Sequence, residues 1–216
     1  MDNVFDLLCE DNVFDLYEHN INGCHDIIKG LKEKNIVSSI RATGTGKSYI
    51  ALSIIYYMFR NKKTIYIVPS LAIAEHLKEI INSNPYLDYD RDFANLEFRT
   101  YQSFVNMSLE EIKALNVDFL VVDEFHHAVT KQYRRIVDYF KPQFLLGMTA
   151  SPERTDGYDL YELFDHNIIY EIRLQQALEE ELLCPFHYFG ISDLWVDTQE
   201  DLSDMEVSFS NLSTKE

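Results

Sequence analysis

The residues with the clearest potential for chemistry form a short loop, TGTGKS at positions 43–48, between an apolar segment and a helical one. Its glycines let the backbone turn tightly, so that several N–H groups point inward at a bound anion. The lysine of such a loop reaches terminal phosphates, and the hydroxyl after it binds Mg2+. Arg41 replaces the first glycine of the strict pattern GxxxxGK[ST]. We expect a phosphate-binding loop made of Thr43, Gly44, Thr45, Gly46, Lys47 and Ser48.

A second group of chemical interest is the acidic pair Asp123 and Glu124, which ends the apolar run 117–122. An aspartate at the end of a buried strand is the acid that holds magnesium beside such a loop. A neighbouring glutamate can orient and deprotonate an attacking water. An acidic pair at a strand end also serves as a helix cap or a solvated turn. Because this pair follows the loop in an alternating series, we expect Ser48 and Asp123 to hold Mg2+, with Lys47, Asp123 and Glu124 as the catalytic group.

The elements that position these residues alternate between strands and helices. Helices are predicted over 21–32, 47–60, 71–81 and 174–183, and strands over 36–40, 64–68, 96–101, 117–122 and 144–148, with a strand-like stretch at 185–191. Apolar strands that alternate with helices predict an α/β fold with a mostly parallel sheet and helices on both faces. Ligands of such sheets bind at the carboxyl ends of the strands. Both groups of chemical interest lie at such ends.

The charge balance argues against strong nucleic-acid binding by this chain alone. The 19 Lys and Arg residues against 36 Asp and Glu give a net charge of −17, whereas nucleic-acid binders usually carry a basic footprint. Basic residues such as Lys62, Arg99 and Arg134 leave room for a local basic track. We therefore expect weak binding of nucleic acid.

The sequence also predicts a compartment. The longest apolar run, 50–59, is shorter than the ~20 residues that span a bilayer, and the acidic N-terminus lacks the basic start of a signal peptide. Cys9, Cys24 and Cys184 are scattered and lack metal-ligand spacing, which suits a reducing environment. We expect a cytoplasmic protein that does not use a membrane.

The N-terminal residues contain a tandem repeat, DNVFDL at 2–7 and again at 11–16. On one continuous helix an offset of nine residues places the copies on opposite faces, so they cannot share one apolar stripe. We interpret the repeat as a local duplication on the surface. The expected organisation is an N-terminal arm at 1–18, a nucleotide-binding domain at 19–190 and an acidic linker at 191–216.

Three segments together resemble a known family. Residues 42–48 (ATGTGKS), 123–126 (DEFH) and 147–157 (GMTASPERTDG) look like motifs I, II and III of superfamily 2 helicases of the DEAD/DEAH type. The resemblance is closest to the group that includes restriction-enzyme helicase subunits, and covers about residues 16–205, with weaker likeness at 17–20, 100–103 and 182–190. It implies a RecA-like domain that binds ATP and Mg2+ as the first motor domain of a helicase or translocase, with DNA favoured over RNA.

The resemblance also implies roles for single residues. Thr149, Ala150 and Ser151 match the motif that couples hydrolysis to domain movement, although a serine stands where threonine is usual. His126 matches a histidine expected to touch the partner domain; the alternative is an ordinary exposed loop histidine. Asn20 stands where the family has a glutamine that reads adenine, and its shorter amide puts adenine selectivity in question.

Nucleic-acid contacts are implied by two further segments. Pro69 and Ser70 resemble motif Ia, and Thr100 and Gln102 belong to a neighbouring strand-contacting motif. Tyr101 beside them could stack on a base, but aromatic residues next to a strand are more often part of the core.

The family's working unit has two RecA-like domains, the second of which contributes arginine fingers and half of the nucleic-acid track. Only 26 residues follow Gly190, so we expect the second domain to be absent from this chain and residues 191–216 to lead toward it. Three functions stay open: a helicase or translocase motor, the motor subunit of a type I or type III restriction system, and a nucleotide-binding interaction module without motor activity.

Overall fold

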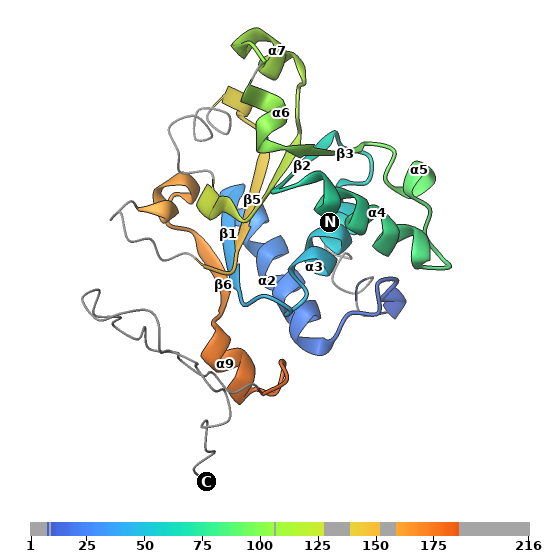
Figure 1. The fold of residues 1–216 in the computed structure, drawn as a ribbon, viewed down its shortest axis with the longest axis vertical. Helices are drawn as coiled ribbons and strands as arrows, with labels where there is room; N and C mark the ends of the chain where they lie inside the picture. Colours follow the sequence, from blue (N-terminus) through green and yellow to red (C-terminus); the bar gives the residue numbers. More distant parts are fainter. Residues whose placement is uncertain (1–7, 9, 106, 128–138, 152–158, 186–216) are drawn as a thin grey trace, which may run out of the picture. The chain divides into compact units, whose positions relative to one another are not determined.

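The computed structural model describes residues 8, 10–105, 107–127, 139–151 and 159–185 (Figure 1). The first copy of the repeat, most of the strand-like stretch 185–191 and the expected linker 191–216 lie outside these residues. Among the described residues, no helix is both long enough and apolar enough to cross a bilayer.

A six-stranded sheet forms the centre of the described fold (Figure 1). Every neighbouring pair of strands is parallel, and the strand order is β3-β2-β4-β5-β1-β6. The strands are β1 (Ile36–Arg41), β2 (Thr64–Val68), β3 (Leu96–Thr100), β4 (Phe119–Asp123), β5 (Phe144–Thr149) and β6 (Ile168–Ile172). Five of them confirm the predicted strands to within two residues at each end, whereas β6 was not predicted.

The described helices include four that lie where the sequence predicts them, though not always with the predicted length, and three short ones that it does not predict. They are α2 (Glu18–Lys34), α3 (Lys47–Ile54), α4 (Leu71–Ser83), α5 (Tyr89–Asp92), α6 (Tyr101–Val105), α7 (Leu109–Ala114) and α9 (Leu174–Glu179), with short 3-10 helices at Phe125–His127 and Leu160–Phe164. The predicted helix 47–60 is α-helical only to Ile54 and continues as a π-helix over Ile55–Phe59. The predicted helix 174–183 is too long.

The early end of α9 has a local cause. Glu181 adopts a left-handed conformation with φ 56°, and the N–H groups of Leu182 and Leu183 both donate to the carbonyl of Ala177. Both bonds satisfy the Ala177 carbonyl near the end of the helix and turn the chain back, as left-handed helix ends commonly do.

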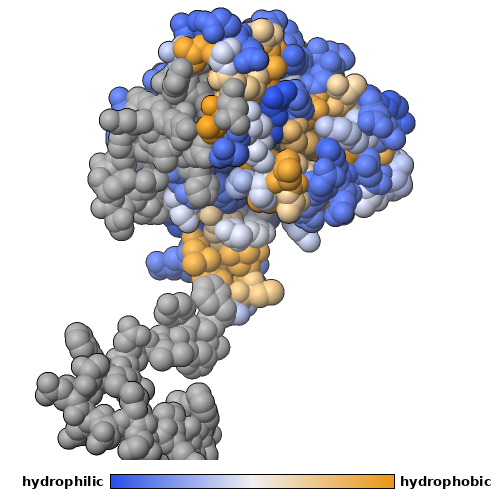
Figure 2. Space-filling model, turned by 45° about the horizontal axis from the view of Figure 1, so that its top comes forward, coloured by the Kyte–Doolittle hydropathy of each residue, from blue (hydrophilic) through white to orange (hydrophobic). Residues whose placement is uncertain are grey.

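Helices cover both faces of the sheet, as predicted. Alternate residues along the strands enter two separate hydrophobic clusters. Tyr66, Val121 and Leu146 pack with α2, α3 and α4, while Ile67, Leu120 and Leu145 pack with α6 and α7. The face seen in Figure 2 is mostly hydrophilic, with hydrophobic residues in smaller groups. Continuous burial on both faces explains why these strands are apolar at nearly every position.

The second copy of the repeat is not a surface feature, so that interpretation is wrong. Phe14 and Leu16 are buried, and the Phe14 ring packs edge-on against the rings of Tyr56 and Phe93. The chain is not one continuous helix here, because Asn12 and Asp15 have positive φ angles. The argument from helical periodicity therefore does not apply, and the second copy is part of the core.

Strand register brings the carboxyl ends of the central strands together. Ile40 of β1 pairs with Thr149 of β5, and Asp123 of β4 pairs with Met148 of β5. The loop after β1 thus lies at the same edge of the sheet as the ends of β4 and β5, where ligands of parallel sheets bind.

Candidate nucleotide-binding site

The loop at 43–48 joins β1 to α3 and depends on its two glycines. Gly44 and Gly46 have φ angles of +87° and +86°, in the region that L side chains rarely adopt. A Cβ on Gly46 would also lie 2.5 Å from Asn20 Nδ2. Thr45 is buried, and its hydroxyl donates to the Ala42 carbonyl at 2.8 Å. The loop is therefore held in shape, and the first N–H groups of α3, which have no acceptor within the helix, would be open to a bound anion.

Lys47 reaches across the site to Glu124. Its Nζ lies 2.8 Å from Glu124 Oε1, and the two side chains are 11% and 24% exposed. The other carboxylate oxygen of Glu124 accepts from the hydroxyl of Thr149 at 3.2 Å and from the N–H of Ala150 at 3.3 Å. One carboxylate thus joins three segments that are far apart in the sequence.

His126 and Ser151 complete this arrangement. Nδ1 of His126 lies 2.8 Å from Thr149 Oγ1 and 3.3 Å from Glu124 Oε2. Because the Thr149 hydroxyl gives its proton to Glu124, the same oxygen accepts from His126 Nδ1 and from the Ser151 N–H at 3.2 Å. We call Lys47, Asp123, Glu124, His126 and Thr149 the carboxylate network. All the residues expected to act in catalysis and coupling lie in it or directly beside it.

The pKa values of the two acids in the network are shifted in opposite directions. Burial raises the pKa of Asp123 to about 6, and the neighbouring charge of Glu124 adds to this, while Lys47 opposes it. Burial alone would also raise the pKa of Glu124, but the hydrogen bond and charge of Lys47 outweigh it, with help from the Ala150 N–H, and hold that pKa below its usual range. Glu124 is thus the acid held ionised by its partners.

The backbone of Glu124 is strained. Its φ of 47° places a non-glycine residue in the left-handed region, which costs about 1–3 kcal/mol and persists only where surrounding contacts determine it. The bonds from Lys47, Thr149 and Ala150 are such contacts. They fix the carboxylate in place at the carboxyl end of β4.

The four residues expected to contact nucleic acid lie at the same edge of the sheet, outside the carboxylate network. Pro69 and Ser70 follow β2, while Thr100 ends β3 and Gln102 is exposed in α6. Ser70 also has a structural role, because its hydroxyl accepts from the Ile73 N–H as the N-cap of α4. Tyr101 is buried with its hydroxyl donating to the Asp123 carbonyl at 3.4 Å. Tyr101 is therefore part of the core.

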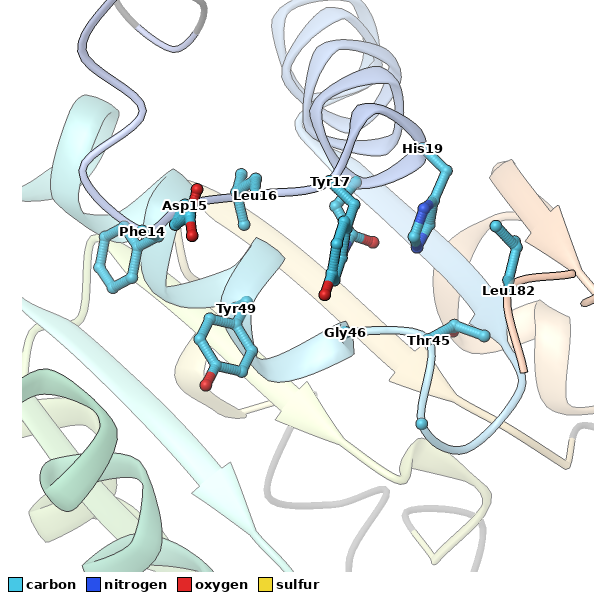
Figure 3. A pocket seen from close by; sticks show the side chains of 11 residues that line it. Phe14, Asp15, Leu16, Tyr17, His19, Thr45, Gly46, Tyr49 and Leu182 are labelled. Carbon is cyan, nitrogen blue, oxygen red and sulfur yellow. The ribbon is translucent and has the colours of Figure 1, made fainter. Parts of the chain in front are cut away.

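A cavity of about 370 Å3 lies between the loop and the residues that lead into α2 (Figure 3). In Figure 3 Tyr17 extends from the start of α2 toward the loop, with Tyr49 to one side and His19 and Leu182 to the other. The rings of Tyr17 and His19 are stacked, with centroids 5.9 Å apart. We call this cavity the loop pocket; its lining residues are Phe14, Asp15, Leu16, Tyr17, His19, Asn20, Gly44, Thr45, Gly46, Tyr49 and Leu182.

Arg41 is the main site residue whose contacts sequence reasoning missed. It is 0% exposed, and its Nη2 donates to Asn20 Oδ1 at 2.7 Å and to the Thr45 carbonyl at 3.1 Å. Its guanidinium also lies over the ring of Tyr170 in β6, 4.7 Å from the centroid. Burial lowers the pKa of Arg41. The only sequence signal was that Arg41 replaces the first glycine of the loop pattern.

The donor set fits a magnesium nucleotide. The loop backbone carries no side chain at Gly44 and Gly46, where an added Cβ would meet Leu183 or Asn20. Lys47 brings a positive charge to the loop, and Ser48 and Asp123 offer a hydroxyl and a carboxylate. Among the described residues no group of three or more His, Cys, Asp or Glu could hold a metal by itself. Mg2+ is usually held by one or two protein ligands together with phosphates and water, and Ser48 and Asp123 would be two such ligands.

Comparison with known proteins shows which family the chain belongs to. A family model described as "Type III restriction enzyme, res subunit" matches residues 13–154. The DNA 3'-5' translocase XPB2 of Sulfurisphaera tokodaii is 31% identical over 155 residues, which cover 68% of this chain and 34% of that protein. The type I restriction enzyme EcoAI endonuclease subunit of Escherichia coli is 27% identical over 187 residues, covering 77% of this chain and 22% of that protein.

A solved structure supports the same fold. The nuclease-deletion mutant of the type ISP restriction-modification enzyme LlaGI, in complex with a DNA substrate mimic, matches with a TM-score of 0.60 at 18% identity. The match covers 77% of this chain and 20% of that one, so the chain spans only a fifth to a third of the relatives described here. The predicted RecA-like α/β fold is confirmed. With the family model matching most of its length, the chain belongs to the family of type III restriction enzyme res-subunit domains, within the superfamily 2 helicases.

Proposed function

We propose that this chain is the ATP-binding and ATP-hydrolysing first motor domain of a DNA helicase or translocase. The observation that carries the proposal is the position of Glu124. Its carboxylate bonds to Lys47 of the loop, 77 residues away in the sequence, and to Thr149 and Ala150 after β5. Segments that resemble motifs I, II and III therefore meet at the carboxylate of Glu124. A site in which nucleotide binding at the loop alters the backbone after β5 would need such a link.

In this proposal the loop residues hold the phosphates. The N–H groups of 43–48 and the Lys47 ammonium bind the phosphate oxygens, and Ser48 with Asp123 would hold Mg2+. When bound, Mg2+ would neutralise charge on those oxygens. The Lys47 ammonium would then shift from Glu124 toward the phosphate oxygens, which compete with Glu124 for its N–H donors.

Glu124 is the proposed general base. It is ionised because Lys47 lowers its pKa, and its position is fixed by Thr149 and Ala150. A carboxylate held in this way can orient an attacking water and accept its proton. Release of Lys47 toward phosphate would make Oε1 available for that water. Nucleotide binding would thereby prepare the base.

His126, Thr149, Ala150 and Ser151 are the proposed coupling residues. A change at Glu124 reaches the backbone after β5 through Thr149 Oγ1, which also accepts from Ser151. In the proposed complete motor, this backbone and His126 would face a second RecA-like domain. That domain would supply the opposing cations that other nucleotide hydrolases need for rapid phosphoryl transfer, worth roughly 10³–10⁵ in rate.

DNA is the nucleic acid that we propose as the track. The support comes from relatives whose names include a DNA translocase and from LlaGI, which was solved with a DNA substrate mimic. Pro69, Ser70, Thr100 and Gln102 are the proposed contacts at the exposed ends of β2 and β3. Because the net charge is −17, the chain alone should bind DNA weakly and with a steep dependence on salt.

A restriction motor is the second candidate, favoured by the family model and by the EcoAI endonuclease subunit. It uses the same ATPase chemistry at the site described above. The two candidates differ only in which further domains accompany the motor. Translocation coupled to cleavage of DNA by the whole protein would favour the restriction motor.

Phosphate release tests the ATPase proposal. We expect slow ATP turnover by the chain, little stimulation by DNA, and a further drop of roughly 10²-fold or more in Glu124→Gln, because an amide cannot accept the proton. Nucleotide affinity should be kept in that variant. Glu110→Gln, the same change at an exposed position in α7, is the matched control and should leave turnover unchanged.

Two outcomes would contradict the proposal. Equal turnover by wild type and Glu124→Gln would remove Glu124 as the base. Rapid turnover by wild type with many-fold stimulation by DNA would mean that the site needs no second domain.

A further inference from the structure

A buried guanidinium lies behind the phosphate-binding loop with no carboxylate beside it. Arg41 is fully buried, and among the described residues it forms no ion pair. The groups that meet its guanidinium are the Asn20 amide, the Thr45 carbonyl and the Tyr170 ring, while Nε and Nη1 have no hydrogen-bond partner. An arginine keeps its proton in proteins, and a buried cation is costly unless an anion compensates it. The uncompensated charge of Arg41 therefore points to a missing anion.

The guanidinium is held in its place. It lies over the Tyr170 ring of β6, and the hydroxyl of Tyr170 donates to the His19 carbonyl at 3.2 Å, which ties β6 to α2. Nη1 fills the space beside Gly23 of α2, where a Cβ would lie 2.6 Å from it. Glycine at this position leaves room for the guanidinium. The positive charge is thus fixed between α2, the loop and β6 and does not reach solvent.

Arg41 also fixes the orientation of one peptide group in the loop. Its Nη2 donates to the Thr45 carbonyl at 3.1 Å. The described residues contain no cis peptide bond, and in a trans peptide the carbonyl and the following N–H point in opposite directions. The Gly46 N–H therefore points away from the guanidinium, and it has no acceptor within the described part of the chain. A charged donor on the carbonyl also polarises the peptide group, which makes that N–H a stronger donor.

The charge of Arg41 acts on other groups around the loop. Burial lowers the pKa of His19, and the charge of Arg41 lowers it further. Burial raises the pKa of Cys24 to about 12 against the opposing effect of Arg41, so the thiol stays neutral and does not compensate the guanidinium. Lys47, by contrast, is paired with Glu124. A cation that acts on side chains through the interior also acts on an anion held by the loop.

An anion in the loop would complete this arrangement, and this step rests on the function proposed above. Phosphates bound by the N–H groups of the loop would accept from the Gly46 N–H on the side of the peptide opposite to Arg41. We propose that Arg41 is a positioning residue for phosphate, which aims and polarises the Gly46 N–H and supplies from behind the loop a positive charge that a bound diphosphate or triphosphate compensates. Arg41 does not touch the ligand itself.

Calorimetric titration with Mg-pyrophosphate tests this proposal at the loop, because pyrophosphate carries no base that would contact the loop pocket. Arg41→Met removes the charge but keeps a flexible side chain that can pack on Tyr170. We expect it to bind pyrophosphate at least roughly tenfold more weakly than wild type does. Arg99→Met is the matched control, because Arg99 also lies over an aromatic ring, that of Phe104, and its loss changes the net charge equally. This control should bind as wild type does.

Arg41→Lys separates the charge from the packing. Lysine keeps the positive charge but lacks the planar fork that serves Asn20 and Thr45 together. If the charge acts on phosphate, Arg41→Lys should bind pyrophosphate several-fold more tightly than Arg41→Met. A purely structural role predicts the opposite order, because methionine fills a dry slot at lower cost than an ammonium group does.

Two results would overturn the inference. One is equal affinity of wild type and Arg41→Met for pyrophosphate, and the other is tighter binding by Arg41→Met than by Arg41→Lys. Failure of wild type to bind both Mg-pyrophosphate and Mg-ATP would instead overturn the proposed function. If thermal unfolding shows that Arg41→Met does not fold, Arg41→Gly takes its place, since glycine at this position completes the strict pattern GxxxxGK[ST] and removes the same charge.

Discussion

The carboxylate network and the loop pocket share one loop but are built in different ways. The network consists of Lys47 at the start of α3 and of charged or polar residues at or just after the ends of β4 and β5, and hydrogen bonds link its members. The pocket is assembled from the N-terminal arm, the start of α2, the loop and the segment after α9, and it includes the largely exposed Tyr17. Phosphate chemistry needs charges at fixed places, whereas a surface for a base can be made from many side chains. The carboxylate network therefore follows the family motifs closely, whereas the loop pocket departs from them, with Asn20 in place of a glutamine.

The largest effect is expected at Gly46, which lines the loop pocket and directly precedes Lys47 of the carboxylate network. Gly46→Ala would force an L side chain into φ +86° and a Cβ to within 2.5 Å of Asn20 Nδ2. We expect the free energy of unfolding to fall by about 1–3 kcal/mol and nucleotide binding to be lost. Chemical denaturation and calorimetry measure the two changes. Near-normal values for both would show that the loop is not held in shape as described.

The second-largest effect is expected from a substitution within the carboxylate network. Thr149→Val removes the hydroxyl that donates to Glu124 and accepts from Ser151, so buried partners lose a bond at a cost of about 1–3 kcal/mol. We expect lower stability and slower hydrolysis with unchanged nucleotide affinity. Thr149→Ser keeps the hydroxyl and should behave nearly as wild type. Equal behaviour of the two variants would mean that the hydroxyl has no role.

A smaller effect is expected from a change confined to the loop pocket. Tyr17→Ala removes an exposed ring, so thermal unfolding should not change, while affinity for a nucleotide falls roughly tenfold, or about 1.4 kcal/mol. Tyr86→Ala is the matched control, because Tyr86 is 75% exposed and does not line this pocket. If both variants bind nucleotide as wild type does, the base does not stack on Tyr17.

Prediction from the sequence succeeded best for residues whose chemical role requires a particular side chain. It found Lys47 from the glycine loop, Asp123 and Glu124 from the end of an apolar strand, and Thr149 from the family resemblance, and the structure brings all four together. It missed β6, since the edge strand Ile168–Ile172 is only partly buried and reads IIYEI rather than as a continuous apolar run. It also placed the second repeat on the surface, because periodicity assumes a continuous helix that Asn12 and Asp15 interrupt.

The contacts of Arg41 show the limit of reading patterns along a chain. The sequence marks Arg41 only as a departure at the first glycine of the loop. That its side chain turns inward to Asn20 and Tyr170 depends on packing among α2, β1 and β6. A contact between side chains on three separate elements has no local sequence signature.

The account depends most directly on Lys47 as the cation that holds a nucleotide. Calorimetric titration of Mg-ATP into wild type, Lys47→Ala and the control Lys78→Ala tests it, since Lys78 pairs with Glu75 and lies over the Tyr89 ring but belongs to neither the carboxylate network nor the loop pocket. We predict that Lys47→Ala weakens binding roughly 10- to 100-fold, because charge-assisted hydrogen bonds are worth about 1.5–3 kcal/mol, and that Lys78→Ala binds as wild type does. Equal affinity in all three proteins would contradict the account.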